Sequence, residues 1–146
     1  MYRFGKKSQL QLDTCHPDLQ LICNEVIKIL DFSVLEGARS LARQIKLKGE
    51  GKSKIDGIKK RSKHQVTMVN PLSNAVDISP YPIDWEDAKR FFFLAGLMKG
   101  VALRLLEEER ITHKLRWGGD WDSDNDFKDQ SFNDLPHFEL IEIKKK

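Results

Sequence analysis

The stretch NDLPHFELIEI, residues 133–143, joins a histidine to alternating polar and apolar residues, a pattern typical of a β-strand. The alternation starts an apolar face at Phe138 and leaves His137 on the opposite face, at the mouth of the strand. Pro136 disfavours a helical conformation for the residue before it. We therefore expect a stiff, non-helical link that holds Asp134 at a fixed distance from His137.

Outward from this strand, helical and strand patterns are interleaved along a chain of 146 residues. They predict a helix over 17–30, a strand over 32–36, a helix ending at Gly49, a strand over 75–81, a long helix capped by Asp84 and running to about 110, and a short strand over 115–117. This order favours an α+β fold, with a small antiparallel sheet backed by helices. The length and an apolar content of 40% are those of one domain, residues 1–146.

Charge is unevenly distributed along the chain, although the formal net charge is only +3. Residues 43–63 are rich in lysine and arginine, and we interpret residues 49–63, with their three glycines, as a mobile basic loop. Residues 120–134 are rich in aspartate. A solvated loop explains either run, and attraction to nucleic acid or to an anionic wall polymer is a second explanation of the basic one.

Several classes of protein are disfavoured by the sequence. The longest apolar run, residues 91–98, is much shorter than the roughly 20 residues of a membrane-spanning helix. The first residues contain no apolar signal-peptide core, so we expect synthesis in a cytoplasm. Cys15 and Cys23 form neither a metal-binding pair nor a disulfide framework, and we expect both to be reduced and structural.

Two of the four histidines stand where a loop meets a strand. His64 precedes the strand that contains Asp77, and His137 opens the last strand. Two imidazoles and one carboxylate would supply three zinc ligands and leave a fourth position for water, which is the arrangement of catalytic zinc sites. Asp134 is then the candidate general base.

Each of these residues also has a purely structural interpretation. A histidine in a basic loop, such as His64, is usually solvated, and an aspartate in a strand, such as Asp77, is usually an edge or turn residue. His16 precedes a proline and is interpreted as a helix N-cap, and His113 is interpreted as a loop histidine. Neither of the last two is assigned a role.

Three blocks of sequence together resemble a known family. They are FSVLEGARSLARQ (32–44), SKH with AVDISPY (62–64 and 75–81), and LRWGGDW with DLPHFEL (115–121 and 134–140). In this order they resemble the zinc D-alanyl-D-alanine carboxypeptidase superfamily, with its hedgehog/D,D-peptidase-like fold and a zinc site on the sheet face. The similarity is greatest to its bacteriophage endolysin branch, the L-alanyl-D-glutamate peptidases that cut peptidoglycan stem peptides.

The resemblance implies a role for each matching residue. His64, Asp77 and His137 match the zinc ligands, and Asp134 matches the catalytic acid/base. Arg39 matches an arginine that contacts the substrate and stabilises the developing oxyanion.

Further substrate contacts are expected from Ser62, which matches a serine near the substrate, and from Trp117, beside the Gly-Gly turn. The sequence departs from the family at one place. In the family the aspartate commonly follows seven positions after the first histidine, and here it follows thirteen positions after it, which we interpret as an insertion of TMVNPL, residues 67–72. Ser73 stands where glycine is usual, so the resemblance does not fix the rim of the pocket.

The stretch DWDSDND, residues 120–126, alternates aspartates like the start of an EF-hand loop. Asn125 replaces the turn glycine, and Ser131 stands at the position of the bidentate glutamate, so an EF-hand is not predicted. A weaker calcium site that orders this loop beside Asp134 remains a hypothesis.

The sequence thus favours a monomeric zinc peptidase of phage origin that cuts the L-alanyl-D-glutamate bond of peptidoglycan and reaches the wall from the host cytoplasm at lysis. Its expected partner is the stem peptide, with no nucleic acid. One alternative is a D-alanyl-D-alanine carboxypeptidase. An alternative of another class is a non-enzymatic basic protein that binds nucleic acid or wall polymer.

Overall fold

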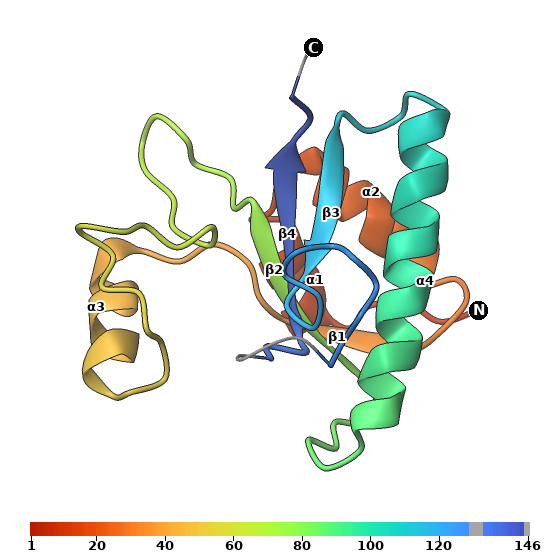
Figure 1. The fold of residues 1–146 in the computed structure, drawn as a ribbon, viewed down its shortest axis with the longest axis horizontal. Helices are drawn as coiled ribbons and strands as arrows, with labels where there is room; N and C mark the ends of the chain where they lie inside the picture. Colours follow the sequence, from red (N-terminus) through yellow and green to blue (C-terminus); the bar gives the residue numbers. More distant parts are fainter. Residues whose placement is uncertain (129–132, 145–146) are drawn as a thin grey trace.

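A computed structural model describes residues 1–128 and 133–144, so Asp129 and Ser131 of the aspartate-rich loop lie outside the described residues. The chain forms helices and strands in the order α1 (Lys6–Leu12), α2 (Pro17–Val26), β1 (Phe32–Glu36), α3 (Leu41–Gly49), β2 (Ala75–Pro80), α4 (Ala88–Glu107), β3 (His113–Trp117) and β4 (His137–Glu142) (Figure 1). This is the predicted α+β architecture. No helix among the described residues is both long enough and apolar enough to cross a bilayer.

The four strands form one antiparallel sheet in the order β1-β2-β4-β3. The strand that opens with His137 therefore lies inside the sheet, between β2 and β3. Helices α1, α2 and α4 pack on one face of this sheet, whereas α3 and the basic loop extend away from it (Figure 1).

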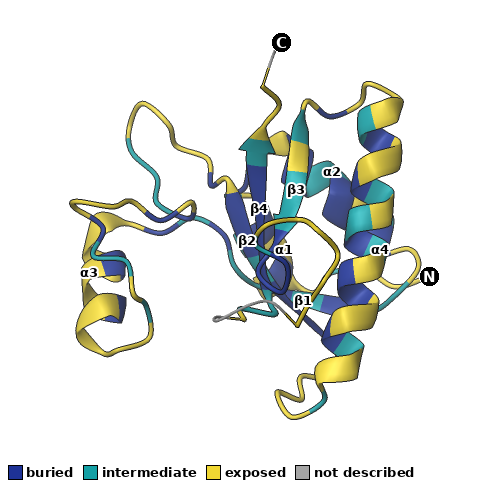
Figure 2. Ribbon diagram, viewed as in Figure 1, coloured by how far each residue is buried: buried dark blue, intermediate teal, exposed yellow. Residues whose placement is uncertain are grey.

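The core lies between that face and the helices. Strands β2 and β4 contribute Val76, Ile78, Phe138 and Leu140, all at most 2% exposed, and the apolar stripes of α2 and α4 cover them (Figure 2). Helix α2 follows the predicted pattern, since His16 caps it and Pro17 is its first residue. Cys15 and Cys23 are buried and free, as expected.

A β-bulge in β1 decides what the other face of the sheet carries. Val34 pairs with Ile78 on the core face, but the next paired residue is Glu36, opposite Asp77. Leu35 is therefore the extra residue of the bulge. In a regular strand that contained Leu35 without a bulge, Glu36 would have the same orientation as Val34 and would face the core, since side chains alternate along a strand.

Three elements differ from the sequence prediction. Helix α1 was not predicted, and it is fixed to the sheet by the Ser8 hydroxyl, which accepts a hydrogen bond from the Val34 backbone N–H at 3.0 Å. Helix α4 begins at Ala88 rather than at Asp84, whose carboxylate instead closes a turn by accepting from the Glu86 N–H. His113 is the first residue of β3 and not a loop residue.

The basic loop is anchored by two glutamine side chains. Gln44, fully buried, donates to the Ser53 hydroxyl at 2.9 Å and to the Ile55 carbonyl at 2.6 Å. Gln65 bridges the loop from the other side, since it donates to the Gly57 carbonyl and accepts from the Ser62 N–H, both at 3.0 Å. These bonds link the loop to helix α3 and to the segment before β2.

Candidate active site

The antiparallel pairing of β2 and β4 places Asp77 directly opposite His137. Cross-strand neighbours on one face have Cβ atoms about 5 Å apart, close enough for their side chains to meet. Asp77 Oδ1 lies 3.2 Å from His137 Nδ1. The two residues are sixty positions apart in sequence, and the sheet register alone brings them together.

His64 reaches the same point from the segment before β2. Its backbone carbonyl accepts from the Arg39 N–H at 2.7 Å, and the Val66 N–H donates to the Arg39 carbonyl at 3.0 Å, so two loop segments are paired like short strands. His64 is 2% exposed, and its Nε2 lies 3.2 Å from both Asp77 Oδ1 and His137 Nδ1.

Three potential ligand atoms therefore form a triangle with sides of 3.2 Å, contributed by His64, Asp77 and His137. Ligands about 2.0–2.1 Å from a tetrahedral zinc ion are about 3.3 Å apart. The donor set of two imidazole nitrogens and one carboxylate oxygen and its spacing both fit such an ion. The predicted ligands are thus brought together at the sheet face.

Neighbouring groups orient both imidazoles so that each turns one ring nitrogen toward the other potential ligands. His64 Nδ1 lies 2.8 Å from the Gly37 carbonyl, and His137 Nε2 lies 2.8 Å from a carboxylate oxygen of Glu139. Both partners only accept, so each ring places its proton there and turns the lone pair of its other nitrogen to the triangle. Glu139, 4% exposed, is held in turn by Arg116 at 2.6 Å. Neither Glu139 nor Arg116 was predicted from the sequence to belong to the site.

The protonation of these groups in the metal-free chain follows from their contacts. Burial opposes ionisation of Asp77, but the charges and hydrogen bonds of His64 and His137 hold its pKa well below the usual range. Burial lowers the pKa of His137, yet hydrogen bonds to Asp77 and Glu139 raise it to about 9. Glu139 is desolvated, but His137 and Arg116 lower its pKa to about 2.

Asp134 lines the same cavity as the three potential ligands. Its carbonyl accepts from the His137 N–H at 3.1 Å, so the link between them is a hydrogen-bonded turn. Its N–H donates to the Gly118 carbonyl at 2.9 Å, and a Cβ on Gly118 would collide with the Asp134 carbonyl oxygen. Burial, followed by the negative charge of Asp77, raises the pKa of Asp134.

Arg39 also lines the cavity, where it is 8% exposed. Its guanidinium donates to both carboxylate oxygens of Glu36, at 3.0 and 3.1 Å, and to the side-chain carbonyl of Gln44 at 2.8 Å. These bonds occupy three of its five N–H groups. Arg39 is therefore rigidly held and retains two donors.

Of the two other residues predicted to contact the substrate, Ser62 lines the cavity and Trp117 does not. Ser62 lines the cavity, and its hydroxyl accepts from the His64 N–H at 3.2 Å. Trp117 is 1% exposed, stacks on Phe138 in the core and does not line the cavity, which corrects its assignment to substrate binding. Trp121 lines the cavity instead, with its ring 5.4 Å from that of His137.

The inserted residues 67–72 do not line the cavity. They form an exposed turn, closed by a bond from the Thr67 N–H to the Asn70 carbonyl, in which Met68 is fully exposed. Ser73 is buried away from the rim, and its N–H donates to the Thr14 carbonyl. The departure from the family spacing therefore leaves the pocket rim untouched.

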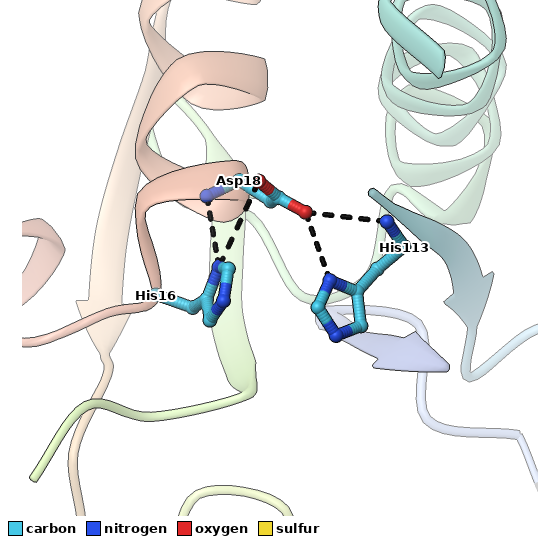
Figure 3. A group of neighbouring side chains, drawn as sticks. All are labelled: His16, Asp18 and His113. Carbon is cyan, nitrogen blue, oxygen red and sulfur yellow. Dashed lines mark hydrogen bonds and ion pairs between the residues drawn. The ribbon is translucent and has the colours of Figure 1, made fainter. Parts of the chain in front are cut away.

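A second group of potential ligands consists of His16, Asp18 and His113 (Figure 3). Asp18 Oδ2 accepts from His113 Nδ1 at 2.9 Å and also from the backbone N–H groups of Thr112 and His113. His16 Nδ1 accepts the Asp18 N–H at 3.0 Å, whereas a neutral histidine bound to a metal through Nε2 would carry a proton on that nitrogen. The group is thus satisfied without an ion, and we assign it a structural role that joins α2 to β3.

Comparison with known proteins identifies the family. The family model described as phage L-alanyl-D-glutamate peptidase matches residues 1–141. The chain belongs to this family. The L-alanyl-D-glutamate peptidase of Escherichia phage T5 is 29% identical over 148 residues, which cover 96% of this chain and 98% of that protein. The crystal structure of the Serratia marcescens L-Ala D-Glu endopeptidase ChiX superposes with a TM-score of 0.69 at 26% identity, over 95% of this chain and 90% of the other.

Membership in the phage L-alanyl-D-glutamate peptidase family establishes the reaction. The chain is a peptidoglycan hydrolase that cleaves the L-alanyl-D-glutamate bond of the stem peptide. The comparisons select this bond over the D-alanyl-D-alanine bond, and they lend no support to a non-enzymatic binding protein.

Proposed function

We propose that this peptidase is a zinc enzyme whose ion is held by His64 Nε2, Asp77 Oδ1 and His137 Nδ1. The observation that carries the proposal is the triangle of ligand atoms with sides of 3.2 Å. Its donor set matches catalytic zinc sites, which have three protein ligands and one open position. The hydrogen bonds that the two imidazoles donate to Gly37 and Glu139 support it, because they fix the tautomers that ligation requires.

The ion would polarise the scissile carbonyl and lower the pKa of a water molecule to roughly 7, which makes hydroxide available at neutral pH. Asp134 is proposed to accept the proton of this water and return it to the departing amine of the D-glutamyl residue. Its position in the cavity and its raised pKa suit both steps, because an acid/base group must hold the proton between them.

Arg39 is proposed to stabilise the negative oxygen that develops on the scissile carbonyl. The two N–H groups left after its bonds to Glu36 and Gln44 are available for this contact. A guanidinium held rigidly before the reaction needs no reorganisation, and one such preorganised donor stabilises the transition state by about 3 to 4 kcal/mol. Ser62 is proposed to support the site through the backbone of His64.

The test is metal content per chain combined with wall lysis before and after chelation. We expect one zinc ion per chain, loss of lysis with a chelator and recovery with zinc. Mass spectrometry of digested muropeptides should show a new D-glutamyl amine. An active, metal-free protein would overturn the proposal.

A second cation site is proposed in the aspartate-rich loop. Asp120, Asp122 and Asp124 each offer a carboxylate oxygen within 4.8 Å of the others. Within the described part of the chain, Asp120 Oδ1 is buried without a hydrogen-bond partner. Oxygen-only ligands suit calcium. Calcium should raise the unfolding temperature of the zinc-loaded protein, and an unchanged temperature in saturating calcium would dismiss the site.

We also propose that the chain acts as a monomer, made in the host cytoplasm and released to the wall at lysis. Its family supports this route. Light scattering at micromolar concentration, and fractionation of infected cells before and after lysis, test the two statements.

A further inference from the structure

The active-site cavity, about 620 Å³ in volume, carries an excess of positive charge. Its cationic lining residues are Arg39, Lys52, Lys54, Lys60, Arg61, Lys63 and Arg116, and its acidic ones are Glu36, Asp77, Asp134 and Glu139. Seven cations thus face four carboxylates, an excess of three before any metal ion binds. A cavity lined by an excess of one charge attracts ligands of the opposite charge.

The excess is concentrated at one part of the wall, which we call the cationic rim: Lys60, Arg61 and Lys63. All three are exposed and line the cavity. In contrast to Arg39 and Arg116, which are paired with carboxylates, none of the three forms an ion pair with a described residue.

The backbone of the cationic rim places it next to the proposed metal ligand His64. Arg61 and Lys63 flank Ser62, whose hydroxyl accepts from the N–H of the proposed ligand His64. The segment is fixed from both sides, because Gln65 bonds to Ser62 and to Gly57, and Gly57 donates to the Lys60 carbonyl at 3.0 Å. Because the backbone of the cationic rim is already held in place, little conformational entropy is lost there when a ligand binds.

The chemistry of the substrate supplies a matching anion. A D-glutamyl residue has two carboxyl groups, and the stem peptide continues through one of them. The other is a free carboxylate within a few bonds of the scissile nitrogen, unless it is amidated. It is negative in the first form and neutral in the second, while its shape hardly changes.

We propose that the cationic rim binds the free carboxylate of the D-glutamyl residue, so that the enzyme discriminates against stem peptides in which this group is a carboxamide. The inference rests on the proposed active site, since that site places the scissile bond in this cavity. It assigns Lys60, Arg61 and Lys63 a role in specificity and none in bond cleavage.

The experiment compares two synthetic peptides that contain the L-alanyl-D-glutamate bond and differ only in a free or amidated D-glutamyl carboxyl. For the zinc-loaded wild type we expect kcat/KM to favour the free carboxylate about tenfold, as for a charge-assisted contact at a partly shielded site. In the triple variant Lys60→Gln, Arg61→Gln, Lys63→Gln this preference should disappear, because the free carboxylate loses its charged contacts.

The matched control is the triple variant Lys46→Gln, Lys48→Gln, Lys59→Gln, which loses the same net charge from exposed residues that do not line the cavity. It should keep the preference. Equal cleavage of both peptides by the wild type would overturn the inference, as would a preference that survives in the rim variant. Equal losses in the two triple variants would also overturn it, because they would indicate a diffuse field.

Binding gives a readout that does not depend on turnover. Calorimetry with the D-glutamyl product peptides, free and amidated, should show the same preference in the wild type and its loss in the rim variant. If the zinc-loaded protein cleaves neither substrate, the proposed catalytic site fails, while selective binding of the carboxylate form would still support the rim.

Discussion

Asp77 and His137 face each other across strands β2 and β4, with Oδ1 and Nδ1 3.2 Å apart. Their proximity is a property of the sheet, so the spacing of these two proposed metal ligands depends on strand register rather than on loop conformation. His64 completes the set from a paired loop.

Removal of Asp134 should separate chemistry from metal binding. Asp134→Ala is expected to retain one zinc ion per chain but to lose about 10²- to 10⁴-fold in kcat, the contribution of a positioned acid/base group. His137→Ala should lose both the ion and the activity. Metal analysis after dialysis and a wall-lysis assay measure the two effects. Full activity of the Asp134→Ala variant would rule out Asp134 as the acid/base group.

Glu139 should control metal affinity through His137. Glu139→Gln weakens the acceptor for the ring N–H and breaks the ion pair with Arg116, so zinc affinity should fall about 10- to 100-fold. Competition with a chromogenic chelator gives the affinity. Glu142→Gln, at the exposed end of the same strand, is the control and should leave it unchanged. Equal affinity in both variants would contradict the role.

Gly118 should be required for the position of Asp134. A methyl group there collides with the Asp134 backbone, so Gly118→Ala is expected to destabilise the protein by about 1 to 3 kcal/mol and to lower kcat/KM. Gly96→Ala is the matched control, because its Cβ meets nothing within 4 Å and the residue lies in helix α4. That variant should gain up to about 1 kcal/mol. Urea unfolding and kinetics measure both.

The inserted turn should be dispensable for catalysis. Residues 67–72 are largely exposed and lie outside the cavity, so their replacement by a short glycine-containing linker should leave zinc content and kcat/KM within about twofold of the wild type. A larger loss of activity, with zinc retained, would show that the turn contacts the substrate.

The contact between His16 and helix α2 should make stability depend on pH. Burial, together with the nearby charge of His113, lowers the pKa of His16 despite the opposing attraction of Asp18. The neutral ring caps the helix, so its contribution is complete above the unfolded pKa of about 6.5 and is lost as pH falls through the lower folded value. At pH about 7.5, His16→Ala should cost about 1 kcal/mol.

The control for this effect is His16→Asn, which keeps a cap acceptor that does not titrate. Between pH about 7 and 5, the free energy of unfolding should fall more steeply in the wild type than in His16→Asn. Parallel slopes would exclude His16 as the titrating group. Asp18 affects stability at lower pH than His16 does. Although burial raises the pKa of Asp18, hydrogen bonds from Thr112 and His113 lower it overall. The contribution of Asp18 to stability is therefore lost only as pH falls below about 4.

The fold was predictable where local pattern and tertiary environment agree. Strands β1, β2 and β4 were found from alternation and flanking breakers, and α2 from its cap and apolar stripe. Helix α1 was missed because KKSQLQL has no acidic residue in its first turn and no side-chain cap. Its stability comes from contacts with β1, and these are invisible in the local sequence.

The site was predictable from family resemblance, and its supporting contacts were not. Glu139 alternates correctly in a strand, and nothing local distinguishes a solvated glutamate from one buried against His137. The position of Trp117 in the core depends on strand register. Trp117 pairs with Phe138, so it belongs to the core face, while Trp121 follows the turn and reaches the cavity.

The extra residue in β1 has a consequence for the design of this molecule. At Leu35 the orientation of the side chains in the edge strand β1 changes. The apolar residue Val34 before it faces the core, and the acidic residue Glu36 after it faces the opposite side of the sheet. If Leu35 were retained in a regular two-residue repeat instead of a bulge, Glu36 would turn into the hydrocarbon interior and Arg39 would lose its carboxylate partner. A single residue without a catalytic group thus determines that Glu36 faces the cavity side of the sheet and not the core side.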